Sequence, residues 1–211
     1  MTTETEKKGK FITLEGVDGA GKSTHIPTII ALLKATGVEV VSTREPGGTP
    51  LGEQLRALLL NDAMHPETET LLMFAARREH IEMVIAPALK RGAYVLSDRF
   101  TDATFAYQHV AKGVAKDKVE QLETWVQGNL QPDLTLLFDV PVEISMARLA
   151  TARAPDKFER ENAQFFERLR VYYLMRAFEN PNRFRIINAN QALDQVKADV
   201  IKALEDKILT I

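Results

Sequence analysis

The chain has 211 residues, a hydrophobic fraction of 45%, a charged fraction of 27% and a formal net charge of −2. This balance is ordinary for a globular protein and creates no global field that would recruit nucleic acid or an anionic membrane. There are no cysteines, which excludes disulfides, thiolate catalysis and Cys-ligated zinc. The apolar runs are shorter than the ~18–20 residues that span a bilayer. Residues 1–9 lack the apolar core of a secretory signal, so we expect a disordered tail, a single domain at 10–211 and a cytoplasmic location.

The first predicted elements are a short strand at 11–14 and a helix that begins after a glycine-rich turn. Gly16, Gly21, Lys22 and Ser23 fit the pattern G-x-x-x-x-G-K-[ST], which binds phosphate when it joins a strand to a helix. Glycines bring backbone N–H groups onto phosphate oxygens, and the helix presents its positive N-terminus to the same anion. The lysine reaches the β- and γ-phosphates, and the serine hydroxyl is a Mg²⁺ ligand. The nucleotide site is predicted to comprise Gly16, Val17, Asp18, Gly19, Ala20, Gly21, Lys22, Ser23 and Thr24.

The rest of the chain alternates between the two periodicities. Further strands are expected at 38–43, 94–98, 134–139 and 184–187, and helices at 51–60, 67–90, 104–110, 116–129, 142–151, 158–178 and 193–208. Pro87 should bend or end the longest of them. This alternation predicts an α/β fold, a five-stranded parallel sheet flanked by helices, with the first strand central beside the strand that ends at Asp98. An apolar strand ending in aspartate after a phosphate loop predicts a second residue near Mg²⁺.

Arginines gather where the predicted strands end. One group comprises Arg44, Arg56, Arg77 and Arg99, and a second basic group surrounds the irregular segment at 152–160. A phosphate loop serves one nucleotide, so further guanidinium groups, whose planar fork suits phosphate oxygens, indicate a second phosphate. The alternative is that individual arginines are solvated or pair with surface carboxylates.

Four blocks of sequence resemble the bacterial thymidylate kinase family. They are L-E-G-V-D-G-A-G-K-S-T (14–24), T-R-E-P-G-G-T-P-L-G (43–52), L-L-M-F-A-A-R-R-E-H (71–80) and D-R-F-T-D-A-T-F-A-Y-Q (98–108), with support from Q-P-D-L-T-L-L-F-D-V-P (131–141). The resemblance runs from about residue 10 to the C-terminus. It implies a P-loop kinase fold, transfer of a phosphoryl group from ATP to dTMP with Mg²⁺, and a homodimer.

The resemblance also implies roles for individual residues. Asp18 would orient the dTMP phosphate or its Mg²⁺ shell, Arg44 and Arg99 would hold that phosphate, and Arg56 would lie beside it. Ser23 and Asp98 would hold the metal. Residues around the sugar and base would be Met73, Phe74, Arg77, Thr104, Tyr107 and Gln108.

Each of these acceptor residues has an implied task. Arg77 would hydrogen-bond the thymine edge, while Thr104 and Gln108 would line the base and help to exclude cytosine. Tyr107 would fill the place of a ribose 2′-hydroxyl. Either Met73 or Phe74 would stack on the base.

A lid at 148–160 would supply the catalytic arginine. The family's lid has Arg-Gly where this chain has Arg153-Ala154, so we expect Arg153 to act, with Arg148 and Arg160 as alternatives. The residues expected to act in catalysis are Asp18, Lys22, Arg99 and Arg153. Two other functions remain open: a kinase for another nucleoside monophosphate, and a P-loop switch NTPase. The latter would carry the guanine-reading N-K-x-D, which the sequence lacks.

Overall fold

A single parallel sheet organises the computed structural model, which describes residues 8–151 and 156–209. Its strands are β1 (Phe11–Glu15), β2 (Val40–Arg44), β3 (Tyr94–Asp98), β4 (Leu134–Asp139) and β5 (Phe184–Asn188). They lie in the order β2-β3-β1-β4-β5, and every neighbouring pair is parallel. The predicted sheet, with the first strand at its centre and β3 beside it, is confirmed.

Burial along the strands follows their place in the sheet. All five residues of β1 are buried, and so are the first five of β4, as expected for strands covered by helices on both faces. The edge strand β2 has only intermediate and exposed positions. Because the strands are parallel, their carboxyl ends meet at one edge of the sheet, which is where α/β folds bind ligands.

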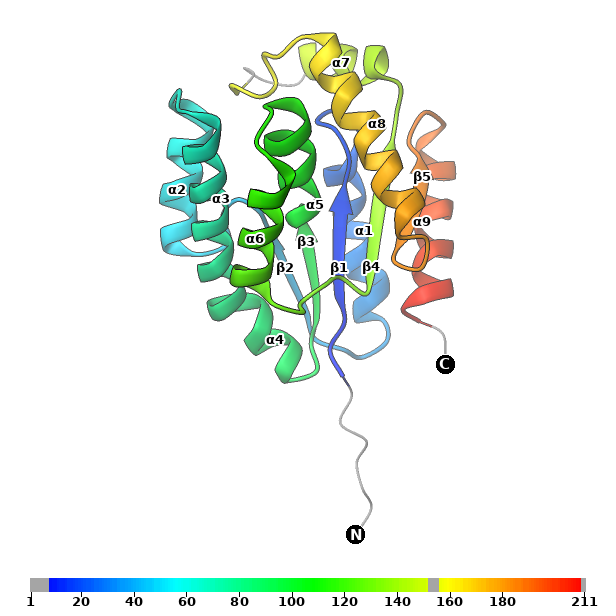
Figure 1. Ribbon diagram of the computed structural model, residues 1–211. Helices are drawn as coiled ribbons and strands as arrows, with labels where there is room; N and C mark the ends of the chain where they lie inside the picture. The colour runs from blue at the N-terminus through cyan, green and yellow to red at the C-terminus, as the bar shows by residue number, and fades with distance from the viewer. Residues whose placement is uncertain (1–7, 152–155, 210–211) are drawn as a thin grey trace.

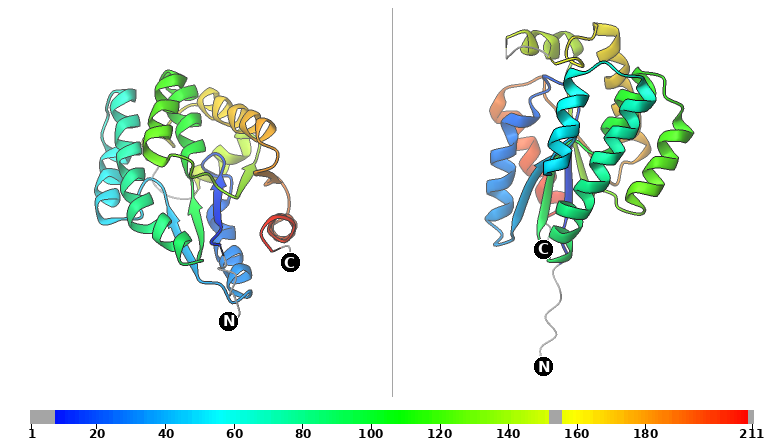
Figure 2. Two further views of the ribbon diagram at one scale, coloured as in Figure 1. Left: turned by 60° about the horizontal axis from the view of Figure 1, so that its bottom comes forward. Right: turned by 90° about the vertical axis from the view of Figure 1, so that its left-hand side faces the viewer.

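Helices cover both faces of the sheet. They are α1 (Lys22–Lys34), α2 (Pro50–Asn61), α3 (Pro66–His80), α4 (Ala86–Lys90), α5 (Thr101–Thr104), α6 (Lys116–Gln127), α7 (Val142–Ala150), α8 (Ala163–Glu179) and α9 (Leu193–Lys207). Figures 1 and 2 show α1 and α9 on one face, and α3, α5, α6 and α8 on the other. Helix α7 lies above the carboxyl ends of the strands (Figure 1).

Three predicted helices differ from the observed ones. The helix expected at 104–110 is almost wholly the π-helical segment η2 (Phe105–Ala111), which follows α5. The helix expected at 67–90 is divided into α3, the π-helical segment η1 (Ile81–Ile85) and α4. Pro87, in the first turn of α4, has no N–H to continue the α-helical bonding, and the π-helical turn lies just before it. The start of the helix expected at 158–178 was wrong. Helix α8 begins at Ala163 because the Asn162 side chain caps it, accepting a hydrogen bond from Phe165 N at 2.9 Å.

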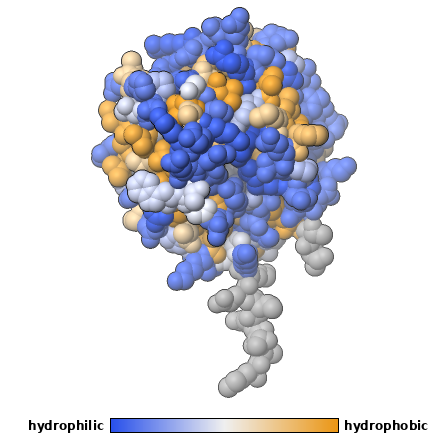
Figure 3. Space-filling view, viewed as in Figure 1, coloured by the Kyte–Doolittle hydropathy of each residue, from blue (hydrophilic) through white to orange (hydrophobic). Residues whose placement is uncertain are grey.

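An apolar groove lies on the surface between α3 and α6. It is lined in part by Leu71, Val114, Leu122 and Trp125, and Trp125 is 82% exposed. On the face seen in Figure 3, apolar residues otherwise lie in patches among hydrophilic ones. Within residues 8–151 and 156–209, no helix has the length and apolar character needed to cross a membrane.

Candidate functional site

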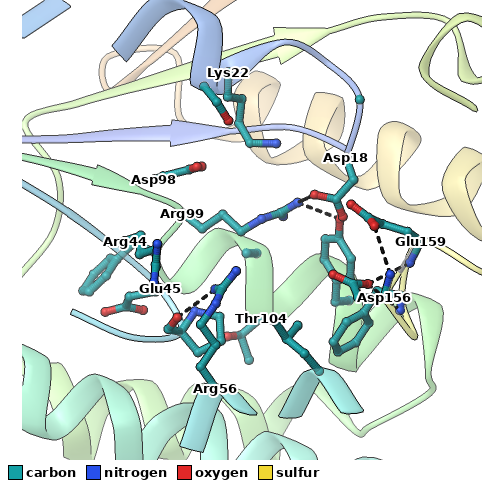
Figure 4. A pocket seen from close by; sticks show the side chains of 18 of the residues that line it. Asp18, Lys22, Arg44, Glu45, Arg56, Asp98, Arg99, Thr104, Asp156 and Glu159 are labelled. Atoms are coloured by element: carbon teal, nitrogen blue, oxygen red, sulfur yellow. Dashed lines mark hydrogen bonds and ion pairs between the residues drawn. The ribbon is translucent and has the colours of Figure 1, made fainter. Parts of the chain in front are cut away.

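A cleft of about 470 Å³ lies at the carboxyl ends of β1, β2 and β3. Its walls come from the phosphate loop, the loop after β2, α3, α7 and the π-helical segment η2 (Phe105–Ala111). Figure 4 shows Asp18, Lys22, Asp98 and Arg99 pointing into it from one side, with Glu45, Arg56 and Thr104 opposite. The cleft therefore brings together residues that the sequence analysis assigned to two different phosphates.

The phosphate loop is packed tightly against β4 and α7. Gly16 has a φ of 129°, and a Cβ there would lie 2.4 Å from the Phe138 carbonyl oxygen; at Gly19 it would lie 2.4 Å from the Ser145 oxygen. Only glycine fits both places. Lys22 Nζ donates to the carbonyl oxygens of Gly16 and Val17, each at 2.9 Å. An ammonium has three donors, so one remains for a phosphate oxygen.

Asp18 and Arg99 form an ion pair at the centre of the cleft. Arg99 Nη2 donates to Asp18 Oδ1 at 2.6 Å, and the Tyr107 hydroxyl donates to Asp18 Oδ2 at 2.8 Å. Burial would raise the pKa of Asp18, but Arg99, Lys22 and the Tyr107 hydrogen bond outweigh it and lower the pKa to about 2. Asp18 is therefore a carboxylate at neutral pH.

Arg99 is held in an unusual backbone conformation, with a φ of 71°. A non-glycine residue in this left-handed region is strained, and such residues concentrate at functional sites. Its guanidinium lies 4.7 Å from the centre of the Tyr107 ring and donates to the Tyr173 hydroxyl at 3.2 Å. Tyr173 donates in turn to the buried Glu15 at 2.9 Å. Tyr107 of η2 and Tyr173 of α8 therefore hold the Arg99 side chain, and Glu15 of β1 supports Tyr173.

Glu15 is completely buried behind this arginine. It accepts hydrogen bonds from Phe100 N at 2.8 Å and from Tyr173. Burial, reinforced by the negative charge of Asp102, raises its pKa to about 8.

Buried polar side chains form the wall opposite the phosphate loop. We call Glu45, Arg77, Thr104 and Gln108 the acceptor wall; they are 5%, 2%, 2% and 1% exposed. Arg77 Nε donates to Glu45 Oε2 at 2.7 Å, and its Nη2 donates to Thr104 Oγ1 at 3.0 Å. Its Nη1 is buried and has no hydrogen-bond partner within the described residues. Since buried donors are nearly always paired, this atom is available to a ligand.

The remaining predicted arginines differ in exposure. Arg44 is exposed and donates to Glu53 at 2.9 Å, whereas Arg56 is partly buried and donates to the Pro46 carbonyl oxygen at 2.9 Å. Arg148, on α7, is exposed and donates to the carbonyl oxygens of Gly19 at 3.4 Å and Ala189 at 3.1 Å. All three line the cleft. Arg153 lies outside the described residues.

The two predicted metal ligands both line the cleft. Asp98 Oδ1 is buried and is the second side-chain atom without a hydrogen-bond partner in the described part of the chain. A bare carboxylate oxygen near a serine hydroxyl suits a hard cation such as Mg²⁺, which prefers oxygen ligands and keeps several waters. The donor set therefore fits the metal that the phosphate loop implies.

Packing separates the two candidates for stacking on a base. Met73 lines the cleft, whereas Phe74 is 1% exposed and lies in the core. The Arg77 guanidinium lies 4.8 Å from the centre of the Phe74 ring, so Phe74 supports the arginine from behind.

Sequence reasoning missed several residues of the cleft. Glu45 anchors Arg77, and Phe158 reaches the cleft from the segment that was expected to be helical. Glu45 does belong to the block T-R-E-P-G-G, so its charge beside a predicted binding loop was an available signal. Nothing in the sequence indicated Phe158.

The sequence profile described as thymidylate kinase matches residues 14–200. The chain is 66% identical to a thymidylate kinase of Methylobacillus flagellatus, covering 94% of this chain and 98% of that one. It is 62% identical to a thymidylate kinase of Cupriavidus metallidurans, covering 97% and 100% respectively. The chain belongs to the thymidylate kinase family.

A solved structure of a thymidylate kinase extends this to the fold. The crystal structure of the Ehrlichia chaffeensis thymidylate kinase superposes with a TM-score of 0.77 at 34% identity, covering 94% of this chain and 99% of the other. The predicted family and the P-loop kinase fold are both confirmed. The thymidylate kinase similarity spans the phosphate loop and the acceptor wall alike.

Proposed function

We propose that this protein phosphorylates dTMP to dTDP, with ATP as the donor and Mg²⁺ as the metal. Membership of the thymidylate kinase family supports the reaction. The observation that carries the acceptor assignment is the free Nη1 of the buried Arg77, a donor held by Glu45 and Thr104 at the side of the cleft. A pyrimidine carbonyl oxygen is the partner that this donor would take.

The acceptor nucleotide would lie between the acceptor wall and the phosphate loop. Met73, rather than Phe74, would contact the thymine ring, because only Met73 lines the cleft. Thr104 and Gln108 would border the base. The Tyr107 ring, anchored through its hydroxyl to Asp18 and Arg99, would close the space that a ribose 2′-hydroxyl needs.

The donor nucleotide would bind with its phosphates in the loop from Gly16 to Thr24. Ser23 and Asp98 would hold Mg²⁺, which neutralises charge on the phosphate oxygens when it is bound. Lys22, already directed across the loop by two carbonyl oxygens, would contribute its remaining donor to the same phosphates. Arg148 would lie beside them on α7.

Phosphoryl transfer requires alignment and charge stabilisation more than covalent chemistry. Arg44 and Arg99 would hold the acceptor phosphate, with Arg56 next to it and Asp18 keeping the Arg99 guanidinium in place. Arg153, from a lid at 148–160, would stabilise the charge of the transferring group. Closure of that lid would exclude water and so limit wasteful hydrolysis of ATP.

The setting of the enzyme is also a proposal. Residues 10–211 would form one kinase domain that works in the cytoplasm on small molecules, without nucleic acid or membrane as partner. A homodimer is supported by the apolar groove between α3 and α6, where Leu71 is 56% and Trp125 is 82% exposed. A second copy of the chain would cover this groove.

A coupled assay of ADP release, with ATP-Mg²⁺ and a panel of nucleoside monophosphates, tests the function. Turnover should be far faster with dTMP than with dCMP, dGMP or AMP, and weaker with dUMP. Faster turnover of another monophosphate would replace the acceptor assignment. ATP hydrolysis that does not depend on any acceptor would favour a P-loop switch protein instead.

A further inference from the structure

A buried carboxylate on α3 lies behind the acceptor wall. Glu69 is 1% exposed, and its oxygens accept hydrogen bonds from two side chains and form an ion pair with a third. Gln108 Nε2 donates to Oε1 at 2.8 Å, and Lys112 Nζ donates to both oxygens at 2.9 Å. Lys157 Nζ lies 2.8 Å from Oε2. The ammonium groups of Lys112 and Lys157 compensate the buried negative charge of Glu69. The hydrogen bond from the uncharged Gln108 is not needed for that, so it points to a further role of Glu69.

The chemistry of a carboxylate decides which way the Gln108 amide points. An ionised carboxylate only accepts hydrogen bonds, whereas a carboxamide has a donating NH₂ end and an accepting oxygen. The NH₂ group of Gln108 must therefore face Glu69. Because Gln108 lines the cleft, its carbonyl oxygen is the end left for a ligand. The backbone of Gln108 is fixed as well. It lies in the π-helical segment η2, and its backbone carbonyl oxygen accepts a hydrogen bond from Val114 N at 3.0 Å.

We propose that Glu69 is a positioning residue for base selection, which holds the Gln108 carboxamide so that only a hydrogen-bond acceptor faces the pyrimidine. N3 of thymine carries a hydrogen and donates, while N3 of cytosine is an acceptor. With its carbonyl oxygen fixed toward the base, Gln108 favours thymine and opposes cytosine. This inference rests on the proposed acceptor site, and it concerns N3 alone, so it gives no preference between thymine and uracil.

The variant Glu69→Gln tests the inference through substrate choice. Lys112 and Lys157 both need an acceptor, so they would take the single oxygen of the new amide and leave its NH₂ group facing Gln108. The Gln108 amide would then turn its NH₂ group toward the base. We expect the ratio of kcat/KM for dTMP to that for dCMP to fall about tenfold, the effect of one mispaired hydrogen bond. The ratio for dTMP to dUMP should not change.

Glu67→Gln is the matched control. Glu67 lies on the same helix, but its side chain is 47% exposed and pairs with Lys118, outside the acceptor wall. It should leave both ratios unchanged. If dCMP turnover is too slow to measure, the inhibition constants of dCMP and dTMP replace kcat/KM. A Glu69→Gln enzyme that loses activity equally toward dTMP, dUMP and dCMP would overturn the inference, because a purely structural role predicts that result.

A second variant separates failure of this inference from failure of the proposed site. Gln108→Leu removes the amide altogether, and it should lower the dTMP/dCMP ratio; adding Glu69→Gln should then have no further effect on that ratio. If Gln108→Leu leaves the ratio unchanged, the assignment of Gln108 to the base is wrong. If it lowers the ratio and Glu69→Gln does not, only the role of Glu69 is wrong. Should Glu69→Gln fail to fold, Glu69→Asp decides, since its shorter carboxylate withdraws from Gln108 and should also lower the ratio.

Discussion

The two walls of the cleft differ in how firmly their polar side chains are held. On the acceptor wall, Arg77 and Gln108 are at most 2% exposed and are hydrogen-bonded to carboxylates behind them. On the donor side Lys22 is buried, but Ser23, Thr24 and Arg148 are exposed. Among the described residues, Arg148 is hydrogen-bonded to backbone carbonyl oxygens.

If the proposed roles are right, base selection and phosphoryl transfer lie on separate walls of the cleft. The wall that would choose the base is already ordered without a ligand. Binding of the acceptor would therefore cost little side-chain conformational entropy there. The side that would handle the polyphosphate chain would rely on backbone N–H groups, Lys22 and the proposed lid. Substitutions on the acceptor wall should therefore affect acceptor affinity and stability together, and those on the donor side should affect kcat.

The largest effect should come from the lid. Arg153→Ala should lower kcat by about 10³–10⁵-fold, the range for an arginine that stabilises a transferring phosphoryl group. The KM for dTMP and the thermal unfolding temperature should change little. Steady-state kinetics would show this, with Arg148→Ala and Arg160→Ala beside it. If one of these instead loses kcat, that arginine has the role assigned to Arg153.

Lys22→Ala should have the next largest effect. Removing one preorganised donor to a developing charge lowers kcat by about 10²–10³-fold. Lys34→Ala, an exposed lysine at the far end of α1, is the control and should match the unmodified enzyme. Equal kcat values for Lys22→Ala and Lys34→Ala would contradict the contact between Lys22 and the phosphates.

Arg77 and Arg44 offer the sharpest contrast between a buried and an exposed arginine. Arg77→Ala leaves the buried Glu45 without its arginine partner, so the free energy of unfolding should fall by about 3–5 kcal/mol, while the KM for dTMP rises. The side chains of Arg44 and Glu53, which form an ion pair, are 54% and 44% exposed. Arg44→Ala should therefore lower the free energy of unfolding by less than about 1 kcal/mol.

Urea denaturation and dTMP kinetics on both variants measure these effects. An unchanged KM for dTMP in Arg77→Ala would refute its contact with the base. Equal losses of stability in the two variants would show that the acceptor wall is no more rigid than the surface.

The last effect is a dependence of stability on pH, and it concerns Glu15, which is buried behind Arg99. Its pKa is about 8 in the folded protein against an ordinary 4.5. Between these values the folded state holds a proton that the unfolded state has released, so the free energy of unfolding should fall as the pH rises from about 4.5 to 8. Glu15→Gln should flatten this dependence. Urea denaturation at several pH values tests it, and parallel profiles for the two proteins would contradict the assignment.

Much of the fold was predictable because its signals are local. The all-apolar β4 and the glycine-rich turn after β1 mark their own structures, and residues such as Lys22 and Asp98 follow from their place after a strand. The predicted start of α8 at residue 158 was wrong because the apolar spacing around Phe158 continues the helical pattern. Asn162, whose side chain caps the first turn of α8, was a weaker signal of where the helix begins.

The partners of the site residues were not predictable from the sequence. Glu45 and Arg77, or Glu69 and Gln108, come from different elements, and only the packing of α3 against η2 and the loop after β2 brings them together. The choice between Met73 and Phe74 likewise depends on which side of α3 faces the core. Adjacent residues on one helix cannot be separated without that packing.

The exposed Trp125 gives the protein a built-in optical probe. It is the only tryptophan in the chain, and it borders the apolar groove on α6. Its fluorescence therefore reports on that groove alone, without a label. An indole that is 82% exposed should emit at long wavelength and be quenched readily by iodide. A shift to shorter wavelength as the protein concentration rises would follow the covering of this groove by a second copy, independently of any assay of catalysis.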